Sequence, residues 1–205
     1  MPRLTATATV LSTFVLATLA AVATCATAQA SQPPADVLAR LPDPTAAVAL
    51  KDPEIPAALR PADGARMLLR VHAVGVQIYE CAAGKDSAWE WQFRGPEATL
   101  TDLRGAKVGD HGAGPFWRLE DGSRIVGQVQ ASAPSPMAGA IPWLLLTMKS
   151  RSGAGALDAV EAVQRINTVG GVAPPPQECV SVSPGRTVRV PYTADYLFWG
   201  GAPSR

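Results

Sequence analysis

Between residues 65 and 199 the chain is a succession of short runs in which apolar and polar residues alternate, each closed by glycine, proline or Asp-Gly. Such alternation is typical of half-buried β-strands, because successive side chains point to opposite faces of a sheet. The runs are 67–74, 76–81, 89–94, 98–101, 116–120, 124–130, 141–148, 163–168, 187–191 and 196–199. They predict an all-β fold, a single-domain antiparallel sandwich or barrel of roughly eight to ten short strands with at most short helices.

Four of these runs allow a more specific prediction. Runs 116–120 and 124–130 are joined by Asp121-Gly122-Ser123, which predicts a β-hairpin, since Asp-Gly is a preferred two-residue turn. Run 141–148 is apolar on both faces, as expected of a strand covered on both sides. Before run 163–168, the spacing of Leu157 and Val160 predicts a short helical turn that passes into the strand.

The composition divides the chain into four segments. Residues 1–30 are predicted to be a signal peptide, and residues 31–64, which contain seven prolines, a Pro-rich N-terminal arm. Proline removes a backbone donor and restricts the residue before it, so regular structure is not expected in that arm. Residues 65–200 form the predicted β-rich domain, and residues 201–205 a C-terminal tail.

The first thirty residues have the three parts of an export signal. Arg3 precedes an apolar run at 10–23, and Ala28-Gln29-Ala30 supplies a cleavage site of small residues. The apolar run is too short to span a bilayer, so no transmembrane segment is expected after removal of the signal. The mature protein is therefore predicted to be secreted or periplasmic. As an alternative, residues 22–25 resemble a lipoprotein signal that would acylate Cys25.

Cysteine usage agrees with this location. Removal of the signal takes away Cys25 and leaves Cys81 and Cys179 in an oxidising compartment, where a single disulfide is expected. Chain-entropy models assign about 4 to 5 kcal/mol to a crosslink that closes a loop of roughly a hundred residues.

The balance of charge excludes two classes of partner. The chain has 18 Lys and Arg against 17 Asp and Glu, and loss of Arg3 with the signal makes the two numbers equal. Proteins that bind nucleic acid or anionic membranes carry clusters of basic residues, and the sequence contains no such cluster. Neither nucleic acid nor a membrane surface is expected as a partner.

The loop around residues 109–117 is the strongest candidate site. It places Asp110 beside His111 between glycines that let a backbone approach closely. Histidine titrates near neutrality, so His111 could act as a general base or a metal ligand with Asp110 orienting it. In the alternative interpretation His111 only caps backbone groups and the glycines serve positive φ angles.

Several other residues are candidates for binding. Trp117 could stack on a ligand, Tyr192 and Tyr196 could offer hydroxyl groups to a cleft, and Arg165 could contribute its charge. The alternatives place Trp117 and the tyrosines in the core and pair Arg165 with Asp195. Trp89, Trp91 and Trp199 are further stacking candidates.

Catalytic and metal motifs are scarce. The sequence contains no Gly-x-Ser-x-Gly nucleophile motif and no phosphate-binding glycine loop before a helix. No cofactor or metal is expected. The alternative is a site made of His72 and His111, completed by Asp110 or Glu80.

Six segments together resemble one known family. They are 77–81, 110–117, 121–123, 143–146, 164–171 and 190–196. This pattern is similar to the domain of unknown function 3455 family over roughly residues 53–199. The resemblance implies an exported protein and supports pairing of Cys81 with Cys179, because the family has a cysteine at each place. It implies no reaction, substrate or catalytic residue.

Together these observations favour an exported β-rich protein that binds a small molecule or an envelope glycan near residues 110–117. A hydrolase or metal-dependent enzyme that uses His111 and Asp110 is the first alternative. A structural envelope component without a small ligand is the second.

Overall fold

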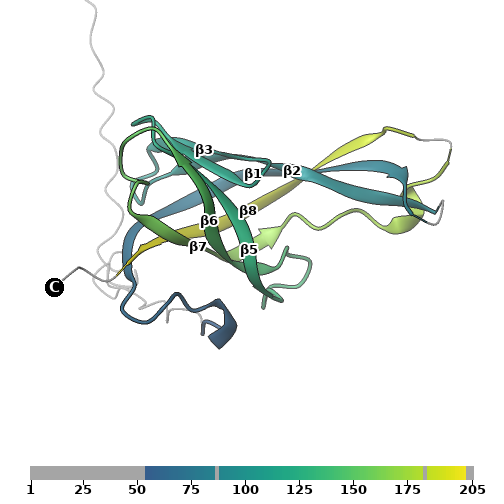
Figure 1. Cartoon of the computed structure of the whole chain (residues 1–205). Coiled ribbons are helices and arrows are strands. Elements are labelled where there is room, and N and C mark those ends of the chain that lie inside the picture. Colours follow the sequence, from purple (N-terminus) through teal and green to yellow (C-terminus); the bar gives the residue numbers. More distant parts are fainter. Residues whose placement is uncertain (1–53, 86–87, 182–183, 202–205) are drawn as a thin grey trace, which may run out of the picture. The chain divides into compact units, whose positions relative to one another are not determined.

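In the computed structural model, which describes residues 54–85, 88–181 and 184–201, eight antiparallel strands form one closed barrel (Figure 1). Each strand pairs with the next along the chain, and the last pairs with the first. The strands are β1 (Arg66–Ala83), β2 (Trp89–Thr101), β3 (Lys107–Gly112), β4 (Phe116–Leu119), β5 (Arg124–Ala133), β6 (Trp143–Ser152), β7 (Val160–Gly170) and β8 (Thr187–Gly200), with 3-10 turns η1 (Ala57–Leu59) and η2 (Pro176–Glu178). The all-β prediction is confirmed, and of the two predicted architectures the chain adopts the barrel.

Some predicted segments lie outside the described residues. These are the signal peptide at residues 1–30 with Cys25, the first part of the Pro-rich arm up to residue 53, and residues 202–205. The predicted domain boundaries therefore stay predictions.

Several strands are longer than the sequence pattern indicates. Runs 67–74 and 76–81 join into β1, because Gly75 continues the strand where a turn was expected. A Cβ atom at Gly75 would lie 2.0 Å from the carbonyl oxygen of Glu97, so the glycine permits close approach of β2. In the same way β2 continues through Gly95-Pro96, opposite a register shift between Ile78 and Tyr79.

The interpretation of residues 109–117 as a loop was wrong over most of its length, because β3 continues to Gly112 and β4 begins at Phe116. Two glycines make β3 pack closely. A Cβ at Gly109 would lie 2.2 Å from the carbonyl oxygen of Arg118, and one at Gly112 would lie 2.4 Å from the Phe116 ring. Gly109 and Gly112 therefore allow β4 to approach β3 closely. Positive φ angles, which favour glycine, occur at Gly105 and Gly114 on either side of the strand.

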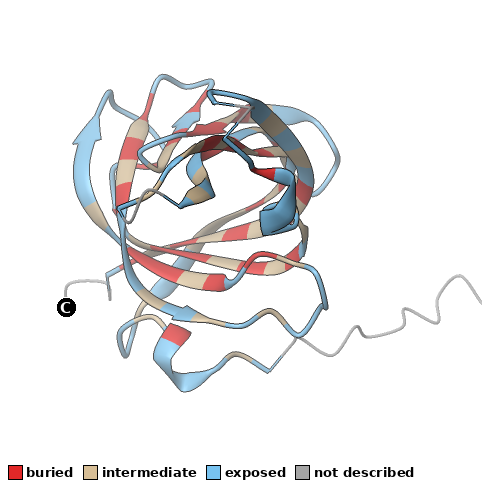
Figure 2. Ribbon diagram, turned by 90° about the vertical axis from the view of Figure 1, so that its right-hand side faces the viewer, coloured by how far each residue is buried: buried red, intermediate tan, exposed pale blue. Residues whose placement is uncertain are grey.

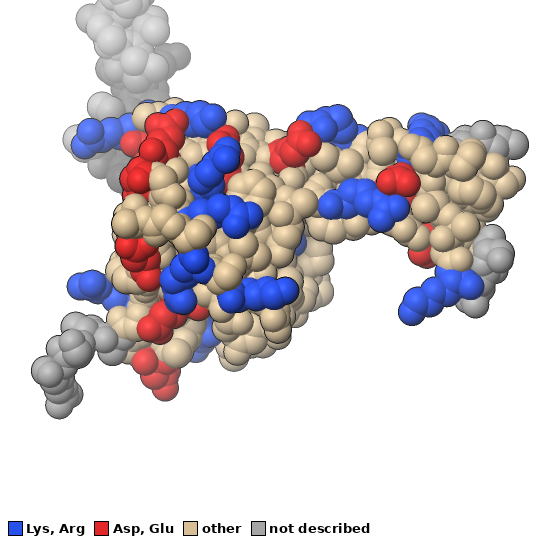
Figure 3. All heavy atoms as spheres, turned by 45° about the horizontal axis from the view of Figure 1, so that its top comes forward, with Lys and Arg blue, Asp and Glu red and all other residues tan. Residues whose placement is uncertain are grey.

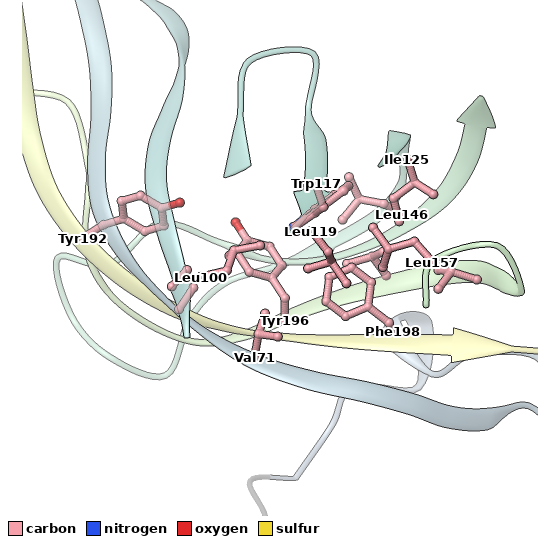
Figure 4. Packing of buried hydrophobic residues seen from close by; sticks show 14 of the residues in the cluster. Val71, Leu100, Trp117, Leu119, Ile125, Leu146, Leu157, Tyr192, Tyr196 and Phe198 are labelled. Atoms are coloured by element: carbon pink, nitrogen blue, oxygen red, sulfur yellow. The ribbon is translucent and has the colours of Figure 1, made fainter. Parts of the chain in front are cut away.

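The barrel interior holds the main core. Alternate positions on the strands are buried (Figure 2), and their side chains meet inside the barrel (Figure 4). The members are Val71, Ala73, Leu100, Trp117, Leu119, Ile125, Ile141, Leu146, Leu157, Val160, Val163, Tyr192, Ala194, Tyr196 and Phe198. An eight-stranded barrel is just wide enough for its interior to be filled by side chains or to hold one small ligand.

A second core lies on the outer wall. Leu59 of η1 is fully buried against Trp143, Leu145 and Ile166, which face outward from β6 and β7. The β6 strand is thus covered on both faces, which confirms the expectation from its apolar pattern.

One end of the barrel is closed by a hydrogen-bonded loop pair. Here the β4–β5 turn meets the β6–β7 loop, and Asp121 joins them. Its carboxylate accepts hydrogen bonds from the Ser123 hydroxyl at 2.6 Å and from the Ala156 amide at 2.8 Å. Leu157 from the same loop is fully buried. Residues 156–159 form turns and no helix, so the helical turn predicted there was wrong.

From the opposite end, β1, β2 and β8 extend beyond the barrel (Figure 1). We call this extension the arm; it is distinct from the Pro-rich segment before β1. The segment after β7 runs along this arm and is fastened by the Cys81–Cys179 disulfide, which confirms the predicted pairing. The Tyr79 hydroxyl also donates a hydrogen bond to the Gly171 carbonyl oxygen at 2.7 Å. The arm and its covering segment therefore form one side of the open end.

Charges on the surface are mixed. On the face in Figure 3, Lys and Arg side chains are interspersed with Asp and Glu over both barrel and arm. Among the described residues no helix is long and apolar enough to cross a membrane.

Candidate functional site

The candidate pair His111 and Asp110 is separated by the barrel wall. The two residues are neighbours on β3, and adjacent strand residues point to opposite faces. His111 points inward and is 4% exposed. Asp110 is on the outside, where its carboxylate contacts Lys107 Nζ and Arg118 Nη2, each at 3.1 Å. The pKa of Asp110 is lowered, first by the hydrogen bond from Lys107 and then by that from Arg118. Asp110 therefore does not orient His111.

His111 is held inside the barrel in one neutral form. Its Nδ1 lies 2.6 Å from the Phe116 carbonyl oxygen, which can only accept, so Nδ1 carries the proton and Nε2 keeps its lone pair. The ring stacks on Trp117 and tilts against Tyr196, with centroids 4.7 and 4.8 Å away. Burial lowers the pKa of His111 to about 3. A base this weak is poorly matched to proton abstraction near neutral pH.

Around His111 lie polar atoms without partners. Gln77, Tyr192 and Tyr196 are each at most 2% exposed. Gln77 Nε2 makes no hydrogen bond within the described part of the chain, and the two tyrosine hydroxyls lack one of good geometry there. The two hydroxyls are nevertheless close enough to influence each other's pKa, and Arg165 is close enough to influence that of Tyr196. Figure 4 shows both hydroxyls directed into the interior. Burial raises the pKa of both tyrosines, so they remain protonated.

Arg165 brings a positive charge to this cluster. It lies on β7, paired with Tyr196, and its Nε and Nη2 donate to the Pro142 carbonyl oxygen at 3.1 and 2.8 Å. Burial is the largest influence on the pKa of His111 and of Tyr196, lowering the first and raising the second. The charge of Arg165 lowers both pKa values, so it adds to the effect of burial at His111 and opposes it at Tyr196. The expected ion pair with Asp195 does not form.

Asp195 instead belongs to the outer wall. Its carboxylate contacts Arg70 Nη2 at 2.8 Å and His72 Nδ1 at 2.9 Å, and it accepts a hydrogen bond from Asn167 at 2.8 Å. His72 is thus on the opposite side of the wall from His111. Among the described residues no three His, Cys, Asp or Glu side chains are grouped to hold a metal ion.

A cavity of about 430 Å³ opens at the arm end of the barrel, which we call the mouth. Of the polar cluster, Gln77, His111 and Arg165 line it directly. Arg94 lines it as well, with its Nε paired to the Glu80 carboxylate at 2.9 Å. Apart from Gly95 and Gly114, the other lining residues are largely apolar: Tyr79, Phe93, Pro96, Pro115, Val129, Ile141, Pro142 and Leu144. A mostly apolar cavity with a few converging polar groups is typical of small-molecule sites.

Of the candidate binding residues, Tyr192, Tyr196 and Arg165 belong to one cluster at the mouth, together with His111. Trp117 is fully buried beneath His111, so it supports the histidine and offers no surface for stacking. Trp89, Trp91 and Trp199 lie away from the mouth cavity.

Gln77 was missed from the sequence, although a signal for it exists. It occupies the inward position of an alternating series that begins at Val71 and Ala73, where a polar residue is unusual. The contribution of the Pro142 backbone carbonyl had no sequence signal, since any residue provides a carbonyl group.

The polar groups of the mouth do not by themselves identify a reaction. The chain has no significant match among the curated proteins or among the solved structures. Its residues 61–200 match the family described as protein of unknown function (DUF3455). This match covers well over half of the chain and includes every strand of the barrel, and the chain therefore belongs to the DUF3455 family.

Proposed function

We propose that this protein binds a small organic molecule in the mouth of its barrel. The observation that carries the proposal is the buried Gln77 Nε2, which lacks a partner among the described residues and belongs to a residue that lines an open cavity together with Arg165 and His111. A buried polar group without a hydrogen bond costs on the order of 1 to 3 kcal/mol. A ligand that supplies the missing partners offsets this cost.

The size and lining of the cavity support a single compact ligand. A volume of about 430 Å³ lies in the range of sites for small molecules, roughly 300 to 1,000 Å³. Trp117 is fully buried, and the exposed aromatic surface of the lining is the single ring of Phe93. A compact molecule therefore fits the mouth better than an extended glycan chain.

Binding is favoured over catalysis by the state of His111. Its pKa of about 3 makes it a weak base near neutral pH, and the expected carboxylate partner, Asp110, faces the other side of the wall. We place the activity outside the cytoplasm, because the chain has a Cys81–Cys179 disulfide and an N-terminal pattern of an export signal.

Ligand-observed NMR with a library of neutral, acidic and basic fragments tests the proposal. Val129 lines the mouth and is 50% exposed, whereas Val74 is 53% exposed on the outer face of β1. We expect fragments that bind the wild type to be lost in Val129→Trp, which fills the mouth, and retained in the matched control Val74→Trp. Equal binding to both variants, or no binding to the wild type, would overturn the proposal.

A further inference from the structure

Two cations line the mouth, and Arg165 is the one without an acid partner among the described residues, since Arg94 pairs with Glu80. Nε and Nη2 of Arg165 both donate to the Pro142 carbonyl oxygen, which fixes the plane of the guanidinium. Burial raises the pKa of the neighbouring Tyr196 hydroxyl and the guanidinium opposes that rise, and both of these neighbours, the carbonyl and the hydroxyl, are neutral groups. A guanidinium held in this way is oriented in advance for a planar acceptor that binds two N–H groups at once.

The carboxylates near this part of the barrel are engaged elsewhere. The ion pairs of the described residues are Arg70–Asp195, His72–Asp195, Arg94–Glu80, Lys107–Asp110, Arg118–Asp110 and Arg189–Glu97. None of them includes Arg165. A partly buried charge is costly unless it is paired, so the mouth favours an anion that comes from outside the chain.

We infer that the ligand of the mouth is a monovalent carboxylate on a compact apolar body, with the carboxylate paired to Arg165. The inference rests on the proposed function, and it names the ligand class for that same site. Pro115, Val129 and Leu144 line the cavity and provide contacts for the apolar body. Gln77 Nε2 lies in the same lining as a further donor without a partner.

The charge of the site selects a carboxylate over a phosphate. Arg94 also lines the cavity, but its charge is balanced by Glu80 at 2.9 Å, so Arg165 supplies the positive charge that has no acid partner among the described residues. The other polar groups are neutral: an amide, a neutral histidine and two protonated tyrosines. A phosphate group near neutral pH carries up to two negative charges and is usually held by more than one cation. One fork of N–H donors matches a single carboxylate.

Three probes of nearly equal shape test this inference on the full chain: phenylacetate, phenylacetamide and phenethylamine. Dissociation constants come from titration followed by NMR. We expect phenylacetate to bind at least about tenfold more tightly than phenylacetamide, because only the acid pairs with the guanidinium. Phenethylamine should bind most weakly. This comparison uses the wild type, so it does not depend on the folding of any variant.

Variants at Arg165 add a second measurement. In Arg165→Gln the preference for phenylacetate over phenylacetamide should disappear, while Arg165→Lys should restore part of it. Arg118→Gln, on the outer face of β4, is the matched control and should leave the preference unchanged. Thermal melts confirm that each variant is folded.

The outcomes separate this inference from the proposed function. If phenylacetamide binds as tightly as phenylacetate, and both are lost in Val129→Trp, the carboxylate is wrong while the binding function stands. If inorganic phosphate competes with phenylacetate at equal concentration, the ligand class is wrong in the same way. If no probe or library fragment binds the wild type, both proposals fail.

Discussion

The two ends of the barrel are built on opposite principles. At the closed end the Asp121 carboxylate has several donors, and Phe198 and Leu119 fill the interior with apolar volume. At the mouth, Gln77 Nε2 lacks a partner in the described part of the chain and lies beside a cavity, while the unpartnered indole nitrogens of Trp143 and Trp199 lie away from that cavity. Packing and paired polar groups stabilise a fold, whereas unpaired buried groups destabilise it. In our proposal the closed end maintains the barrel and the mouth is kept for a ligand.

The same strands serve both ends. On β8, Phe198 packs near the closed end and Tyr192 lies toward the mouth, and on β7 Val163 is followed by Arg165. Along each of these strands, the inward-facing side chains therefore change from apolar near the closed end to polar near the mouth. The contrast can be tested by changing matched residues at the two ends and measuring stability and binding separately.

The largest effect is expected at the closed end. Phe198→Ala removes a fully buried ring that packs edge-on against Trp117 at 6.1 Å. We expect the free energy of unfolding to fall by about 3 to 5 kcal/mol in urea titrations, through lost burial and the cavity left behind. Phe93→Ala is the control, because Phe93 lines the mouth and is 54% exposed. A similar loss in both variants would contradict the division between the two ends.

An intermediate effect is expected from acid. The pKa of His111 is about 3 in the folded protein against an ordinary value of 6.5, so between these values the unfolded chain takes up a proton that the folded protein does not. The free energy of unfolding therefore falls as the pH decreases through this window. From about pH 6.5 to 5, where most carboxylates stay ionised, the loss is on the order of 2 kcal/mol.

Chemical denaturation at several pH values measures this slope. His111→Gln should remove most of it, since glutamine does not titrate. His72→Gln should retain it, because His72 lies on the outer wall with its side chain 45% exposed. A slope unchanged in His111→Gln would show that the buried histidine is not its source.

The smallest effect has opposite signs at two tyrosines. Tyr192→Phe removes a buried hydroxyl without a partner and should raise the free energy of unfolding by about 1 kcal/mol. Tyr79→Phe removes a hydroxyl that donates to the Gly171 carbonyl oxygen at 2.7 Å and should lower it by about the same amount. Thermal unfolding compares the two variants directly. If both variants lose stability, the Tyr192 hydroxyl has a stabilising hydrogen-bond partner, and the contrast between the two tyrosines is wrong.

The fold class followed from the sequence because alternation and turns are local signals. The Asp121-Gly122-Ser123 hairpin and the doubly covered β6 needed only neighbouring residues. The joining of short runs into long strands did not follow, because Gly75 and Gly95 look like turn residues until the strand opposite them is known. Their role depends on contacts with residues distant in sequence.

The candidate site was predicted in part. Tyr192, Tyr196, Arg165 and His111 were selected individually, but their meeting at one end of a barrel depends on strand register. Asp110 was paired with His111 because the two are adjacent in sequence, and that adjacency places them on opposite faces once residues 107–112 form a strand. The predicted pairing of Asp110 with His111 was therefore wrong because a strand was taken for a loop.

The even number of strands has a consequence for how this molecule can be handled. The first strand begins and the last strand ends side by side, with Arg66 opposite Gly200, at the end remote from the mouth. The chain before β1 packs through Leu59 on the outer wall. A tag, a fluorophore or a surface linker placed after Gly201 would therefore hold the barrel with its opening directed away from the support, leaving the path of a diffusing ligand unobstructed.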